Sequence, residues 1–336
     1  MDDLITKPNP ERAHRQSAAL QAQLRASLSY LAGEAAKAEI LDLAQFGDWM
    51  DRMIGQRLSP ACFGAYYDLI AAMEKGQKRR AAVLFGEITE TPVCGTTISI
   101  RRLGDDYTAG ETRRIRKFMG GAGTGASGVR RPNHRKVARF ETVLRDALDW
   151  IERRAPELAA EIDASIREII LVGPDRSGRE AFEGGTSFKL TGALVLNAER
   201  DVDVADLVVT LAHEAGHAIL FGECCDEMLV ENPDTERHWS PIREERRPLE
   251  GIFHAGFVSS RMLWVLDRME EDPQFSLHEQ ITMTTARADA SQVFAECVSI
   301  VGQKARLTAT GTRIFGQMRK TQSARDLANR TLRAVS

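Results

Sequence analysis

The chain has 336 residues, 43% hydrophobic and 28% charged, a composition typical of soluble globular proteins. Its 45 Lys and Arg against 48 Asp and Glu residues give a net charge of -3, so charge alone demands neither nucleic acid nor an anionic membrane as partner. We see no signal peptide and no apolar stretch long and uncharged enough to span a bilayer, and therefore expect a cytoplasmic protein. An odd number of irregularly spaced cysteines predicts reduced thiols; they are Cys62, Cys94, Cys224, Cys225 and Cys297.

Residues 1–110 are predicted to form an N-terminal helical region. Leucines at helical spacing, such as Leu20, Leu24 and Leu28, indicate several packed helices, with breaks near residues 58–60 and 74–76. Alternating apolar and polar residues at 96–102 indicate a short strand.

Residues 111–139 are predicted to be a basic, glycine-rich linker. Residues 123–128 match G-x-G-x-x-G, but the strand and helix that a dinucleotide site requires on either side are missing from the pattern, so we reject that interpretation. The surrounding basic residues can bind an acidic peptide or nucleic acid, or simply be solvated, and we favour solvation; they are Arg113, Arg114, Arg116, Lys117, Arg130, Arg131, Arg135, Lys136 and Arg139.

Residues 140–336 are predicted to form the catalytic domain. Helices are expected from Phe140 and from Pro156, and strands at 168–174 and within 184–197. Residues 284–335 indicate two helices, in which we identify no catalytic residues. The second strand region runs almost directly into the strongest signature of the chain, and its edge is suited to pairing with an extended peptide.

That signature is His213-Glu214-x-x-His217. Residues i and i+4 of a helix lie on one face, so both imidazoles can bind one metal ion. Asp203 and Asp206 have the spacing of a capping box, which predicts that the helix starts there, and Gly222 predicts its end. Apolar residues surround the motif, and a buried imidazole without a partner is unfavourable, which argues against a chance match.

A second helix, expected from Pro248 onward, offers the third ligand. Glu250 and His254 are both candidates. Glu250 would complete the His2Glu set of zinc peptidases, with Glu214 as general base, whereas His254 would give three imidazoles and leave positions open for a cosubstrate on iron.

The motif together with Arg247-Pro248-Leu249-x-Gly251-x-x-His254 resembles the HEXXH-motif peptide-modification proteins, a family of 2-oxoglutarate-dependent HExxH-type peptide β-hydroxylases of ribosomally made peptide pathways. The predicted elements indicate a mostly helical α+β protein, with an N-terminal helical region and a C-terminal zincin-like metal-binding region that contains a small sheet. The resemblance implies Fe(II), 2-oxoglutarate and O2, hydroxylation of the β-carbon of a residue in a precursor peptide, and His254 as the third ligand. Ala255 replaces the glycine that usually follows this histidine, and residues 243–247 depart from the commoner Trp-Arg-acidic pattern.

Cationic and acidic residues complete the predicted site. Arg247, and after it Arg243, would hold the distal carboxylate of 2-oxoglutarate, because a guanidinium fork matches a carboxylate; either arginine can instead pair with a neighbouring glutamate. Glu214 would hydrogen-bond a ligand or a bound water. Glu296 is a weaker candidate for a buried acid. The alternative is a zinc peptidase with His213, His217 and Glu250 as ligands, and a peptide-binding protein with a structural metal is a third possibility.

Overall fold

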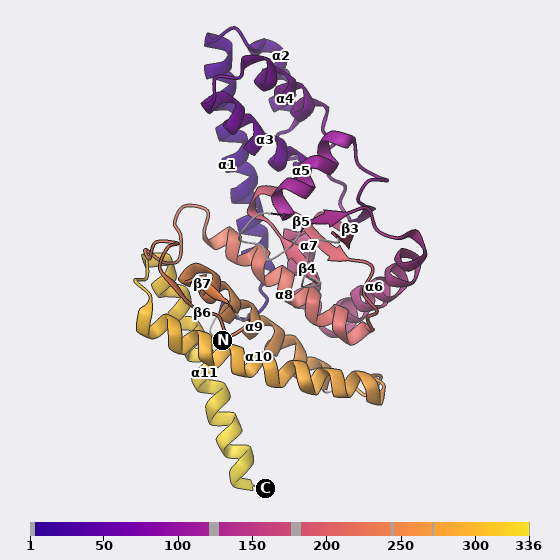
Figure 1. The fold of residues 1–336 in the computed structure, drawn as a ribbon, viewed down its shortest axis with the longest axis vertical. Helices are drawn as coiled ribbons and strands as arrows, with labels where there is room; N and C mark the ends of the chain where they lie inside the picture. The colour runs from indigo at the N-terminus through magenta and orange to yellow at the C-terminus, as the bar shows by residue number, and fades with distance from the viewer. Residues whose placement is uncertain (1–3, 121–127, 176–182, 243–244, 271, 336) are drawn as a thin grey trace. The chain divides into compact units, whose positions relative to one another are not determined.

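A computed structural model of the chain describes residues 4–120, 128–175, 183–242, 245–270 and 272–335 (Figure 1). The predicted fold class is confirmed: these residues form a mostly helical α+β protein with a small mixed sheet. The chain divides into two compact units. Unit 1 contains residues 1–13, 140–162 and 201–336, and unit 2 contains residues 14–139 and 163–200.

Unit 2 opens with the predicted N-terminal helices. Leu28, Phe46 and Phe85 lie in one apolar core shared by these helices. Their bounds are α1 (Pro10–Lys37, whose first residues belong to unit 1), α2 (Leu43–Arg52), α3 (Pro60–Glu74) and α4 (Lys78–Glu90). The break predicted at residues 58–60 is the start of α3, where Ser59 accepts a hydrogen bond from the Cys62 amide.

The segment predicted as a linker contains regular structure. Helix α5 (Ala109–Met119) is followed by β2 (Val129–Arg130), and α6 (His134–Arg154) begins before residue 140. Thr108 and Glu111 form a capping box at the start of α5. The helix also buries Ile115, Phe118 and Met119. These apolar residues form an amphipathic pattern that is hard to recognise in the sequence because basic residues stand between them. Residues 121–127 of the glycine-rich stretch lie outside the described residues.

The sheet of unit 2 has the strand order β1-β3-β5-β4, with β2 paired to β3. Strands β1 (Ser99–Arg102), β3 (Glu168–Pro174) and β5 (Ala193–Asn197) run parallel, and β4 (Gly184–Thr186) is antiparallel at the edge. A short 3-10 helix, η1 (Phe188–Leu190), connects β4 to β5. Every residue of β5 is buried, as expected for a central parallel strand.

Unit 1 is built mainly from long helices. These are most of α6 and α7 (Pro156–Ser165), then α8 (Val204–Glu223), α9 (Leu249–Glu270), α10 (Leu277–Lys304) and α11 (Ala309–Val335), with a hairpin of β6 (Arg237–Trp239) and β7 (Arg246–Pro248) before α9. Helix α9 packs against both α8 and α10 (Figure 1). Contrary to expectation, α8 is long and apolar enough by length and composition to cross a membrane. However, 67% of an 18-residue apolar stretch of this helix is buried inside the protein, as in a core helix.

Candidate metal centre

The helix that carries the HExxH motif begins and ends where the sequence predicted. The Asp203 side chain accepts a hydrogen bond from the Asp206 amide at 2.8 Å, and the Asp206 side chain accepts one from the Asp203 amide at 3.4 Å, which completes a capping box. Helix α8 ends at Glu223, one residue beyond the predicted stop. Leu207, Leu211 and most other residues of α8 are buried, so the motif lies on a core helix whose position is fixed by packing.

Close packing of α9 against α8 occurs at the glycine inside the motif. A Cβ atom on Gly216 would lie 3.2 Å from Arg261 Cγ and 3.3 Å from Val258 Cγ1. On the other side of α9, a Cβ atom on Gly256 would lie 2.8 Å from Cys297 Cβ of α10. These two glycines let α9 approach both neighbours, and that approach brings His254 to the histidines of α8.

The three predicted imidazoles lie together in unit 1. The ring centroids of His213 and His217 are 4.9 Å apart, and those of His217 and His254 are 5.6 Å apart. The Nδ1 atoms of His217 and His254 face each other at 3.4 Å. Two nitrogens bound to one tetrahedral ion at bonds of about 2.0–2.1 Å are separated by about 3.3 Å, so this pair has the spacing that a shared metal ion requires.

The electrostatic setting keeps His217 neutral. Loss of hydration lowers its pKa well below the ordinary value, and the neighbouring His213 and His254 lower it further because three imidazolium charges would repel one another. Neutral imidazole is the form that binds metal. His217 therefore has the protonation state that a metal ligand needs before any ion binds.

Glu250 lies behind His254 and not beside the other histidines. Its Oε1 is 3.6 Å from His254 Nε2, and its carboxylate accepts hydrogen bonds from the backbone amides of Leu229 at 3.4 Å and Val230 at 3.2 Å. This places a carboxylate on the ring nitrogen opposite the one that faces His217. In metal sites such a carboxylate orients the ligand imidazole and fixes its tautomer.

His213 also contacts a methionine of α9. Its Nδ1 lies 3.3 Å from the Met262 sulfur, a contact that sequence reasoning missed although Met262 follows His254 by two helical turns. Among the described residues, no group of three or more His, Cys, Asp or Glu side chains is arranged to hold a metal ion as it stands. The donors are nevertheless of the chemical type that binds a metal, and the His213 side chain is 28% exposed.

The remaining candidate residues have separate environments. Glu214 is buried, with Oε1 4.0 Å from His213 Nε2. Arg247 Nε donates to Glu245 at 2.8 Å, which is the local pairing foreseen as an alternative. Arg243 lies outside the described residues. The expectation for Glu296 is wrong: it is exposed on α10 and accepts a hydrogen bond from Gln292, because Phe294, Cys297 and Val298 supply the buried face.

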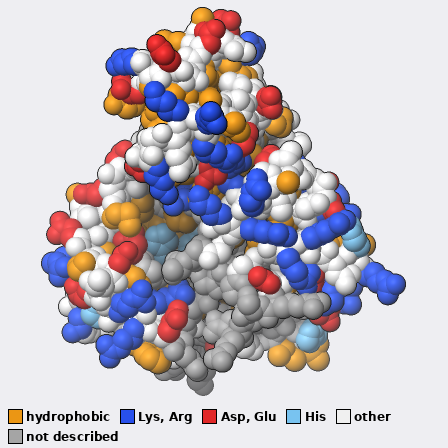
Figure 2. All heavy atoms as spheres, turned by 45° about the horizontal axis from the view of Figure 1, so that its top comes forward, with side chains coloured by type: hydrophobic (Ala, Val, Ile, Leu, Met, Phe, Trp, Pro, Cys, Tyr) orange, Lys and Arg blue, Asp and Glu red, His pale blue; other side chains and the backbone are white. Residues whose placement is uncertain are grey.

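Several of the basic residues near α5 and β2 form ion pairs with nearby carboxylates. Asp68 pairs with Arg114 and Lys117, and Glu199 pairs with Arg130. On the face drawn in Figure 2, Lys and Arg side chains are numerous and Asp and Glu side chains lie among them.

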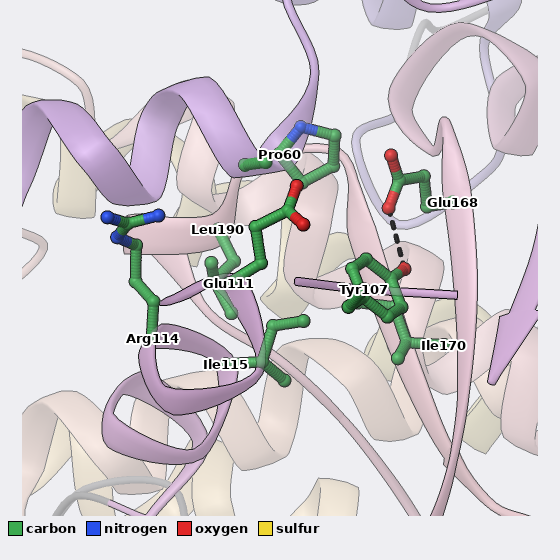
Figure 3. Close-up of a pocket in the computed structure, with 9 residues that line it drawn as sticks. Pro60, Tyr107, Glu111, Arg114, Ile115, Glu168, Ile170 and Leu190 are labelled. Atoms are coloured by element: carbon green, nitrogen blue, oxygen red, sulfur yellow. Dashed lines mark hydrogen bonds between the residues drawn. The ribbon is translucent and has the colours of Figure 1, made fainter. Parts of the chain in front are cut away.

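Unit 2 also has a small pocket between α3, α5 and β3, shown in Figure 3. In it the Tyr107 hydroxyl donates to the buried Glu168 carboxylate at 2.8 Å, and Glu111 and Arg114 extend from α5.

The free cysteines agree with the expected reduced thiols. Neither the known protein-family models nor the curated proteins include a match to this chain.

Proposed function

We propose that the chain is an Fe(II)- and 2-oxoglutarate-dependent oxygenase that hydroxylates the β-carbon of a residue in a peptide. The observation that supports the proposal most is the gathering of His213, His217 and His254, with Glu250 held behind His254 by backbone amides. The resemblance of the two sequence motifs supplies the reaction class, the cosubstrates and a ribosomally made precursor peptide as partner.

In this proposal the three histidines would hold iron as neutral imidazoles, and Glu250 would orient His254. Bound iron with 2-oxoglutarate and O2 supplies the oxidising power that converts a C–H bond into C–OH, with succinate and CO2 as the other products. A facial set of three protein ligands leaves positions for the cosubstrates.

Arg247 would bind the distal carboxylate of 2-oxoglutarate, with Arg243 as second candidate. The Arg247 side chain is 21% exposed and its partner Glu245 is 57% exposed, so the cosubstrate would replace Glu245 on the guanidinium. Glu214, buried beside His213, would hold a bound water or a ligand by hydrogen bonding.

The test is an anaerobic visible spectrum of the Fe(II)-loaded protein with and without 2-oxoglutarate. A metal-to-ligand charge-transfer band that appears only with 2-oxoglutarate is the expected result. The His254→Ala variant should lose the band, whereas Glu245→Ala should keep it and require less 2-oxoglutarate. Absence of a band in protein that has bound iron would reject the proposal.

A zinc peptidase remains the second candidate because Glu214 is buried next to His213, where a general base is needed. Its ligand set would be His213, His217 and Glu250. Glu250→Gln separates the candidates: a peptidase should lose its metal, since Glu250 would be a ligand, and an oxygenase should retain metal with reduced affinity. Metal content after gel filtration measures this difference.

A further inference from the structure

Unit 2 holds a buried guanidinium whose hydrogen-bonding capacity is mostly unused. Arg167, just before β3, is 5% exposed, and its Nη1 donates to the Thr96 carbonyl at a long 3.4 Å. Among the described residues, neither its Nε nor its Nη2 has a hydrogen-bond partner. These two nitrogens form one edge of the guanidinium, with parallel N–H groups that match two oxygens of a carboxylate or phosphate.

The surroundings of Arg167 supply too little negative charge. Asp163 Oδ1 is 3.6 Å from Nη2, beyond hydrogen-bond distance, and its side chain is 51% exposed. Glu168, next in the chain, accepts a hydrogen bond from the Tyr107 hydroxyl at 2.8 Å (Figure 3). It also accepts one from Arg101 Nη1 at 3.4 Å. Cys94 contributes no charge, because burial raises the pKa of its thiol to about 11.

A second guanidinium increases the excess of positive charge. Arg57 is half-buried, and its Nη1 donates to the Asp163 backbone carbonyl at 3.4 Å. Burial, followed by the charge of Arg57, lowers the pKa of Arg167. Near these two guanidinium groups, Asp163 contributes one partly solvated carboxylate, 3.6 Å from Arg167 Nη2, and the two buried N–H groups of Arg167 have no acceptor among the described residues, which is unfavourable unless an anion is bound.

We propose that Arg167 and Arg57 form a binding site for a small oxyanion, a phosphate or carboxylate group whose two oxygens accept hydrogen bonds from Arg167 Nε and Nη2. The half-exposed Asp163 side chain turns outward when the anion enters. The site is independent of the histidine cluster. A phosphate group should bind more tightly than a carboxylate, because it carries more charge beside the two guanidinium groups.

The experiment is calorimetric titration of the full chain with inorganic phosphate and, separately, with acetate, at ionic strength held constant with sodium chloride. Saturable binding is expected. Arg167→Lys keeps the charge but removes the fork, and should weaken binding by about tenfold or more, the scale of a lost charge-assisted hydrogen bond. Arg57→Gln, at a half-buried position where folding should be preserved, should weaken it similarly, and Asp163→Asn should tighten it by removing the competing carboxylate.

Two controls locate the binding. Arg79→Gln removes an exposed arginine of α4 in the same unit and should leave the affinity unchanged, as should His217→Ala in the histidine cluster. If acetate binds more tightly than phosphate, the site is supported and its ligand is a carboxylate. The proposal is overturned if neither anion binds saturably, if Arg167→Lys and Arg57→Gln bind like the parent, or if His217→Ala abolishes binding.

Discussion

At the scale of single residues, a buried ion pair of unit 1 includes Arg261, which packs against Gly216 of the motif helix. Arg261 of α9 pairs with Glu161 of α7, and both are almost completely buried. Glu161 also accepts a hydrogen bond from the Asn9 amide at 3.0 Å, and Arg261 donates to the Ile5 carbonyl at 3.4 Å. The pair therefore connects the first residues of the chain with two helices.

Removing one partner should leave the other charge buried without compensation. We expect Glu161→Leu and Arg261→Met each to lower the free energy of unfolding by about 3–5 kcal/mol. The double variant Glu161→Leu with Arg261→Met should lose less than either single change, because it buries no unpaired charge. Urea denaturation of the four proteins measures this, and additive losses would contradict the interpretation.

Asp68 should make the stability of unit 2 depend on pH. Burial alone would raise the pKa of its carboxyl, but hydrogen bonds from Lys117 and Arg114 outweigh this and lower the pKa overall. A lowered folded-state pKa means that the stabilisation is present above the unfolded-state pKa and disappears as the pH falls through the folded-state value. The gap in unfolding free energy between the parent and Asp68→Asn should thus be largest near neutral pH and shrink in acid. A gap that does not change with pH would refute this.

At the scale of elements, the α8–α9 interface should be sensitive to volume at Gly216. Gly216→Val should push α9 away from α8, lower the free energy of unfolding by about 1–3 kcal/mol, and weaken metal binding by separating His217 from His254. Gly251 of α9 is the matched control, since a Cβ atom there meets nothing within 4 Å. Gly251→Ala should stabilise the helix by about 0.5–1 kcal/mol and leave metal affinity unchanged. Thermal unfolding and chelator competition measure both effects.

Local signals made some elements predictable. The start of α8 depends on two aspartates three residues apart, and the start of α7 on Pro156, so both were evident from the sequence. Helix α5 was missed because its buried Ile115 and Phe118 are interleaved with arginines. The position of Glu296 was misjudged because four apolar neighbours do not show which face of a helix is buried.

The candidate site was predictable only in part, for a related reason. The spacing of His213 and His217 fixes their common face within one helix. The choice between Glu250 and His254 depends on how α9 packs against α8 and on the amides of Leu229 and Val230, which lie 20 or more residues earlier in the chain. The contact of Met262 with His213 likewise joins two helices. Sequence spacing carries no information about such packing.

At the scale of the whole molecule, the two units are interleaved along the chain. Unit 1 combines residues 1–13, 140–162 and 201–336, so the chain leaves or re-enters it after residues 13, 139, 162 and 200. A cut at one position cannot separate them. Strand β3 lies between β1 and β5, and the core around it combines Leu103 and Phe118 with Ile170 and Val195.

We therefore expect a fragment of residues 140–336 not to fold cooperatively, even though it contains all three histidines. Strands β3 and β5 would expose Ile170 and Val195. The Arg261–Glu161 pair would lose its hydrogen bonds to the Ile5 carbonyl and the Asn9 amide. Near-ultraviolet circular dichroism and urea titration should show weak tertiary signal and a broad transition, whereas the full-length His217→Ala variant should unfold sharply. A sharp transition in the fragment would mean that the C-terminal segment supplies a complete core of its own.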